Sequence, residues 1–415
     1  MGRARPAVRD WTTSNVLQAL VTLLAALILA VSALLSSEAT GAWHDALRQQ
    51  IKRSAMSLEN IRHVYADEAP DALRVAVAET RAARLRLGAD PLTRTEAAVE
   101  TQVAWHLRTA HRGDGTLLDG DRYRVPGKGF DVPKRLAALE RAAAAPQPEA
   151  ALREGDRAGD LASLIGMLTV PIVLAYLVGQ AALLTRRRRR TRRKEGNVGL
   201  IPEPERDRRF ALTLGVSVWI AMNLLAPVYA YAQIQEQRAL ISAAAHADRV
   251  AASIAGSSLA FAFRLTAERE ALHLDMRAAA RDYVALDADG RAPGQHEIAT
   301  ADAAAARTVE QIAAYMSRTP TAGDGVRDAT LELLTATPAD WNTLLARQVA
   351  QADLAARAGE WGNLLGLVIL FIAFAAALVA LAEVTQPTQR AGVLRKTAVG
   401  MLAASVLLVA YGVIT

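Results

Sequence analysis

The sequence predicts an all-α integral membrane protein with five transmembrane helices and two large helical-bundle loops outside the cytoplasm. Three observations carry this prediction: five long apolar runs, a block of arginines beside one of them, and helical periodicity in between. A helix needs about 20 apolar residues to cross a hydrocarbon core of roughly 30 Å. A buried helix of a soluble protein is the alternative for any single run, but five such runs in one chain favour a membrane.

The runs divide the chain into spans and connecting segments. The transmembrane helices are expected at residues 16–36, 161–184, 210–232, 361–382 and 397–414. The segments around them are an N-terminal stub, a first loop, a basic linker, a second loop and a short linker, at residues 1–15, 37–160, 185–209, 233–360 and 383–396.

Basic residues orient these spans. The block in linker 185–209 consists of Arg186, Arg187, Arg188, Arg189, Arg190, Arg192, Arg193 and Lys194. Basic segments beside membrane spans stay in the cytoplasm. The stub and linker 383–396 are also basic, whereas residues 38–160 balance 19 basic against 19 acidic side chains and residues 233–360 hold 12 against 17. The N-terminus is therefore predicted to be cytoplasmic and both loops extracytoplasmic.

The first run has a competing interpretation. A basic stretch precedes it and small residues follow it, as in a secretory signal peptide. Its apolar stretch is longer than the roughly 7–15 residues of such a peptide, which favours a retained transmembrane helix. Cleavage would leave the orientation of the other spans unchanged.

Composition limits the chemistry and the partners. The chain has no cysteine, which excludes disulfides, thiolate chemistry and cysteine-ligated metals. The net charge of +6 lies largely in linker 185–209, so we expect anionic lipid headgroups at the arginine block and no nucleic acid. Alanine is abundant and arginine far outnumbers lysine, which is typical of a GC-rich bacterial genome. The predicted location is therefore a bacterial cytoplasmic membrane.

The first loop has the periodicity of helices. A helix is expected to continue out of the first span, with an apolar seam of Leu47, Ile51, Leu58, Ile61 and Tyr65. Three more are expected over 70–87, from about residue 93, and over 134–145. The third should bury a face formed by Val99, Val103, Leu107 and Ala110. Together the four predict a bundle. One short hairpin is expected over 117–125, turning at Asp119 and Gly120.

The second loop repeats this plan. Helices are expected over 266–286, 300–317, 326–335 and 338–358. The last has a capping pattern, with Thr337 as N-cap, Pro338 at the first helical position and Asp340 three residues on. Two halves of equal plan and orientation suggest a parallel tandem repeat, and independent helical hairpins are the alternative.

Few residues suggest a site within the membrane. Gly362 and Gly366 form a G-x-x-x-G pattern that lets helix backbones approach, so they are candidates for helix packing. Glu383 is the candidate intramembrane polar residue, although at the edge of its span it can reach headgroups or pair with nearby basic side chains.

The sequence predicts no metal site and no cofactor. His106 and His111 are five residues apart and do not stack on one helical face. The acidic residues Asp114, Asp119 and Asp121 miss the spacing of an EF-hand loop.

These features favour a non-enzymatic protein whose extracytoplasmic bundles bind a partner or ligand, as a sensor, scaffold or accessory subunit. The topology resembles the helical-bundle input modules of bacterial receptors, in which a membrane hairpin holds an external bundle. A protein partner or a homo-oligomer is expected. A transporter or channel component, and a membrane enzyme acting on a lipid or envelope substrate, are the alternatives.

Overall fold

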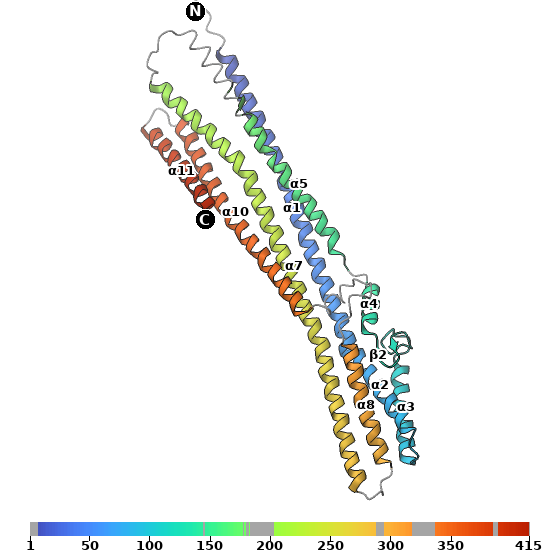
Figure 1. The fold of residues 1–415 in the computed structure, drawn as a ribbon. Coiled ribbons are helices and arrows are strands. Elements are labelled where there is room, and N and C mark those ends of the chain that lie inside the picture. The colour runs from blue at the N-terminus through green and yellow to red at the C-terminus, as the bar shows by residue number, and fades with distance from the viewer. Residues whose placement is uncertain are drawn as a thin grey trace, which may run out of the picture. The chain divides into compact units, whose positions relative to one another are not determined.

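The structure is a computed structural model, and almost all of what it describes is helix (Figure 1). It describes residues 7–143, 146–176, 178–179, 182, 203–287, 294–317, 337–384 and 389–414.

The chain forms two compact units, and each takes segments from both halves of the sequence. Unit 1 comprises residues 1–47, 148–244 and 348–415, and unit 2 comprises residues 48–147 and 245–347. All five apolar runs fall in unit 1. Unit 2 is built entirely from the two loops.

Within the described residues, five helices are long and apolar enough to cross a membrane, as the hydropathy predicts. These helical stretches are Leu23–Leu85, Pro148–Tyr176, Ser217–Leu286, Pro338–Val379 and Gly392–Gly412. The helices that contain the runs are α1 (Ala7–Arg62), α5 (Pro148–Met167), α7 (Glu203–Asp287), α10 (Pro338–Val384) and α11 (Gln389–Ile414). On α1 the side chains of Leu23 and Leu34 are 69% and 72% exposed. Large apolar side chains exposed along a whole helix are characteristic of a surface that meets lipid rather than water.

The second apolar run is interrupted at Leu168. α5 ends at Met167, and the chain is helical again from residue 169. Pro171 has no N–H to donate to the carbonyl of Met167, which explains a break here. The Thr169 hydroxyl donates to the Gly166 carbonyl at 2.7 Å and so satisfies one of the exposed acceptors.

The contact between α1 and α5 in unit 1 is centred on Trp43. Its ring is 1% exposed, and its Nε1 donates to Asp156 Oδ1 at 3.2 Å. The ring lies over two glycines of α5: a Cβ on Gly155 would be 2.5 Å from Cδ1, and one on Gly159 would be 3.0 Å from the far edge of the ring. The glycines therefore leave room for the indole between the two helices.

This contact makes a testable prediction. Gly155→Leu should displace Trp43 and lower the thermal midpoint of the detergent-purified protein, because overpacking a filled contact costs about 1–3 kcal/mol. Gly41→Leu is the matched control, since Gly41 lies on α1 and a Cβ there meets no atom within 4 Å. If both variants melt like the wild type, the Trp43 contact does not contribute to stability.

The larger of the hydrophobic clusters described in unit 2 takes side chains from both loops. Ile61, Leu117 and Leu136 from the first loop lie in the same cluster as Phe263 and Val309 from the second. The ring centroids of Tyr65 and Phe263 are 5.7 Å apart, and the Tyr65 hydroxyl donates to the carbonyl oxygen of Met316 at 2.9 Å. Burial raises the pKa of the Tyr65 phenol, so it stays a donor. The two loops thus fold together in unit 2, instead of each closing around a core of its own.

The helices of unit 2 largely follow the sequence. They are η1 (His63–Glu68), a π-helical turn, followed by α2 (Ala69–Leu85), α3 (Pro91–Ala110), α4 (Val132–Ala142) and α8 (Gln295–Met316). The helix expected over 266–286 is the end of α7, and the one expected over 326–335 lies outside the described residues. The capping box is confirmed: Thr337 N donates to Asp340 Oδ2 at 2.8 Å, and Asp340 N to Thr337 Oγ1 at 3.3 Å.

Two details of the first loop differ from the prediction. The hairpin pairs β1 (Arg124–Val125) with β2 (Gly129–Phe130), so it turns after Asp119 and Gly120. Gly129 explains the position, because its φ of +113° suits glycine and a Cβ there would lie 3.0 Å from Ile312 of α8. β2 accordingly lies against α8 (Figure 1).

The expected buried faces were also partly wrong. In the seam, Ile61 and Tyr65 are buried, whereas Ile51 is 48% exposed. On α3 the predicted face is exposed at Val99 and Val103, and the buried positions are Thr93, Ala97 and Ala104.

Candidate binding cleft in unit 2

A buried ion pair holds the turn-rich segment of residues 111–131 in place. Glu68 closes the π-helical turn η1 and is 4% exposed. Arg135 of α4 donates to both of its carboxylate oxygens, from Nη2 at 2.7 Å and from Nε at 3.0 and 3.1 Å. The backbone N–H of Leu117 donates to Glu68 Oε2 at 2.9 Å, and His63 Nε2 lies 3.2 Å from Oε1. One carboxylate thereby joins η1, α4 and the segment that carries the hairpin.

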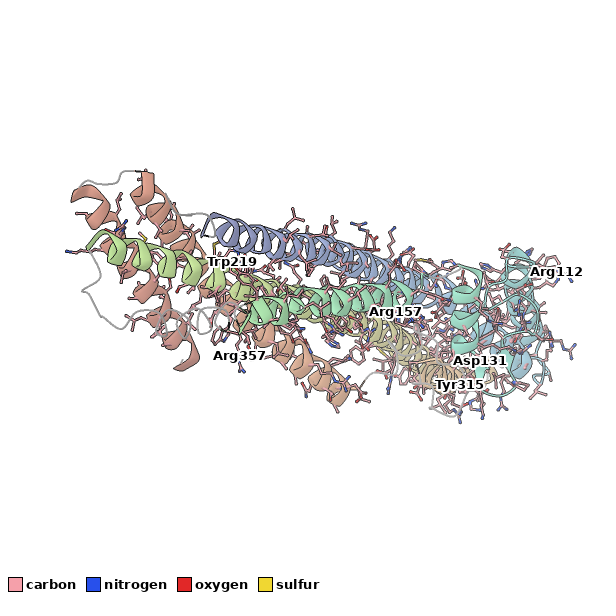
Figure 2. All side chains as sticks on the ribbon, turned by 90° about the horizontal axis from the view of Figure 1, so that it is seen from above. Arg112, Asp131, Arg157, Trp219, Tyr315 and Arg357 are labelled. Atoms are coloured by element: carbon pink, nitrogen blue, oxygen red, sulfur yellow. The ribbon has the colours of Figure 1, made fainter. Side chains whose placement is uncertain are left out.

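Burial lowers the pKa of Arg135, but the hydrogen bonds and negative charge of Glu68, together with Tyr123, outweigh burial, and the net shift of the pKa is upward. Arg135 therefore stays charged. Its guanidinium also faces the ring of Tyr123, 5.9 Å from the centroid. At the start of α4, Asp131 accepts a hydrogen bond from Lys134 N at 3.0 Å and caps the helix (Figure 2). The contacts of Arg135 and Asp131 thus hold the hairpin segment against α4.

A second buried cluster joins α2, α7 and α8. The carboxylate of Asp302 on α8 is fully buried and receives bidentate hydrogen bonds from Arg277 at 2.8 and 2.9 Å. Arg81 Nε lies 2.8 Å and Arg281 Nη1 3.4 Å from the same group. Burial lowers the pKa of Arg81, Asp302 acts against that shift, and the neighbouring cations Arg277 and Arg281 add to it.

The excess positive charge of this cluster is balanced from α3. Arg81 also pairs with Glu100 and, more distantly, with Glu96 at 3.9 Å. The cluster therefore ties α3, α2, α7 and α8 together through one guanidinium and one carboxylate.

The candidate site is an open cleft of about 430 Å³ between α2, the β-hairpin and α8. Its polar wall contains Glu79, Thr80, Arg124, Lys128 and Gln311. Apolar side chains of Ile312 and Phe130 form part of the rest. Its volume lies within the roughly 300–1,000 Å³ of ligand pockets, but its polar lining differs from that of most small-molecule sites.

The charged side chains of the cleft differ in whether they already have an ion-pair partner. Glu79 accepts from Arg124 at 2.8 Å and from Arg108 at 2.7 Å, so its carboxylate is already neutralised. Lys128 is exposed at the hairpin turn and has no ion-pair partner among the residues that the structure describes. The cleft thus presents a free ammonium group beside fixed polar side chains, an arrangement suited to a carboxylate.

The candidate site residues predicted from the sequence do not line this cleft, and some of them lie outside the described residues. The block Arg186–Arg190, Arg192, Arg193 and Lys194 lies outside the described residues, and of Glu383 only the helical backbone near the end of α10 is described. Gly362 and Gly366 lie on α10 where it faces α7. A Cβ on Gly362 would be 2.9 Å from Gln233 Nε2, and one on Gly366 3.4 Å from the ring of Tyr229.

The acidic residues of the turn and His111 make polar contacts within unit 2. Asp119 accepts from Gly113 N at 3.0 Å, and Asp121 lies 3.9 Å from Arg124. His111 Nε2 is 3.3 Å from Asp71 Oδ2. Within the described part of the chain, no group of three or more histidine and acidic side chains is arranged to hold a metal ion.

Sequence reasoning missed Glu68, Arg81, Arg135 and Asp302. The sequence feature that could have revealed them is a charged residue on an otherwise apolar helical face. Asp302, which lies among alanines in TADAAAA, is an example. Each needs a partner far along the chain, since Glu68 and Arg135 are 67 residues apart.

The chain matches no protein-family model, and neither the curated proteins nor the solved structures contain a significant match.

Proposed function

We propose that this chain is a multi-pass protein of a bacterial cytoplasmic membrane and that its extracytoplasmic helical unit binds a partner, as a non-enzymatic sensor, scaffold or accessory subunit. The five apolar helices support the membrane location. The alternation of basic linkers with neutral or acidic loops supports the orientation, with the arginine block in the cytoplasm near anionic headgroups.

The observation that carries the binding role is the cleft between α2, the hairpin and α8. Two buried ion networks hold its walls, one at Glu68 and one at Asp302, so the surface is formed before a partner arrives. Preformed surfaces lose less conformational entropy on binding. The cleft is open and has an uncommitted cation at Lys128, so the proposed occupant is an acidic segment of a partner protein.

In-cell photocrosslinking tests this proposal. A photoreactive amino acid in place of Gln311, in the cleft, should give a discrete crosslinked product with one partner protein. Lys128→Glu in the same chain should remove that product, because it reverses the charge that the acidic segment meets.

The matched control is Arg112→Glu, which makes the same charge change on an exposed residue of the same turn-rich segment but outside the cleft (Figure 2). Crosslinking should survive Arg112→Glu. A product that persists in Lys128→Glu, or the absence of any product from the cleft position, would refute the assignment.

A further inference from the structure

Unit 1 contains a second groove, between α7 and α10, that the partner-binding role does not use. Its volume is about 570 Å³. Six of its lining residues carry the argument: Tyr231, Arg238, Ala239, Leu354, Arg357 and Trp361.

The groove lies where two of the apolar runs reach the loop side. Tyr231 stands at the end of run 210–232 and Trp361 at the start of run 361–382. Tyrosine and tryptophan concentrate at the membrane–water interface, where an apolar ring can carry a polar edge. At 1.5 Å per residue, Arg357 lies about 6 Å and Arg238 about 10 Å beyond these rings along their helices. The headgroup layer on each side of a bilayer is about 5–8 Å thick, so Arg357 falls within it and Arg238 lies beyond it.

The two arginines differ in what they contact. Arg238 is fixed by Asp156 at 3.1 Å and Asp160 at 3.7 Å, both on α5. Arg357 is exposed on α10 (Figure 2) and has no ion-pair partner within the described part of the chain. A guanidinium fork matches the geometry of a phosphate and binds it through two parallel hydrogen bonds.

The remaining wall is apolar on its membrane side. The rings of Tyr231 and Trp361, which are 42% and 39% exposed, lie on the membrane side of Arg357, whereas Leu354 and Ala239 lie on its loop side. The groove therefore offers a cation above and apolar surface below, in the order in which a phospholipid presents its phosphate and its glycerol and acyl chains.

We propose that this groove binds a membrane phospholipid, with Arg357 as the main contact of its phosphate. The inference requires that α7 and α10 cross a membrane, but it does not depend on the partner cleft. It is also distinct from lipid contact at the arginine block, because linker 185–209 precedes run 210–232 and the groove follows it, so the two lie at opposite ends of the same span.

The test reads out the groove itself. A photoreactive amino acid replaces Leu354 in the full-length protein, which is reconstituted into vesicles of phosphatidylcholine with a limiting amount of phosphatidylglycerol. We expect a lipid-sized mass addition on the α10 peptide. Arg357→Gln should lower its yield about tenfold, the loss that corresponds to hydrogen bonds between charged groups. Arg347→Gln, the same change on an exposed residue of α10 outside the groove, should leave it unchanged.

Two further arms separate the sources of the phosphate. Diacylglycerol has the acyl chains without the phosphate. Its crosslinking yield on the wild-type protein should be no higher than the yield of phosphatidylglycerol on Arg357→Gln. Excess inorganic phosphate should not reduce the lipid product; if it does, the groove binds free phosphate and the lipid proposal is wrong. Equal yields from the wild type and Arg357→Gln would also overturn it.

Discussion

Glu68→Ala is expected to lower the free energy of unfolding of unit 2 by about 3–5 kcal/mol, the usual loss when one partner of a buried ion pair is removed. The Arg135 side chain is 9% exposed and its guanidinium would be left without its carboxylate, and Leu117 N would lose its acceptor. The segment of residues 111–131 should open with it. Hydrogen exchange measured by mass spectrometry on the full-length protein in detergent reports this as faster exchange in peptides from α4 and the hairpin.

Two variants give this prediction its controls. Glu59→Ala makes the same change in an exposed pair with Arg62 and should alter exchange little, because surface pairs are screened by solvent. A double variant, Glu68→Leu with Arg135→Leu, should recover part of the loss, since it leaves no unpaired buried charge. If Glu68→Ala exchanges like Glu59→Ala, then Glu68 does not hold the segment in place.

Asp302→Leu is the second variant with a large expected effect. It removes the one carboxylate that contacts Arg81, Arg277 and Arg281 together, and so leaves three cations close to one another. A loss of about 3–5 kcal/mol is expected here too. Faster hydrogen exchange should appear in α2 and α8.

Glu310→Leu is the matched control for this cluster. Glu310 lies on the same helix α8, and its side chain is exposed. It should therefore leave exchange in α2 unchanged. Wild-type exchange in Asp302→Leu would mean that the arginine cluster does not tie α2 to α8.

The sequence predicts the long apolar helices well, because hydropathy over a long window is a local property. The same holds for the start of α10, where Thr337, Pro338 and Asp340 determine the cap from within four consecutive residues. Which segments pack together is different. Nothing local to Ile61 or Phe263 indicates that they share a core, because that depends on how both loops fold.

The errors on buried faces have the same origin. The apolar positions Val99 and Val103 suggest the buried face of α3, yet the structure buries Ala97 and Ala104. Small side chains let α3 approach its neighbour closely, and hydropathy alone does not detect that preference. The cleft was beyond prediction for a related reason, since Glu79, Lys128 and Gln311 come from three distant segments.

Single-cysteine labelling tests the central claim most directly, because the native chain has no cysteine and every signal comes from the introduced residue. Arg112→Cys places a thiol on the exposed surface of unit 2, and Gly196→Cys places one in the basic linker. If unit 2 is extracytoplasmic, a membrane-impermeant maleimide should label Arg112→Cys in intact cells and Gly196→Cys only after lysis. Labelling of Gly196→Cys in intact cells, with Arg112→Cys protected until lysis, would contradict the account.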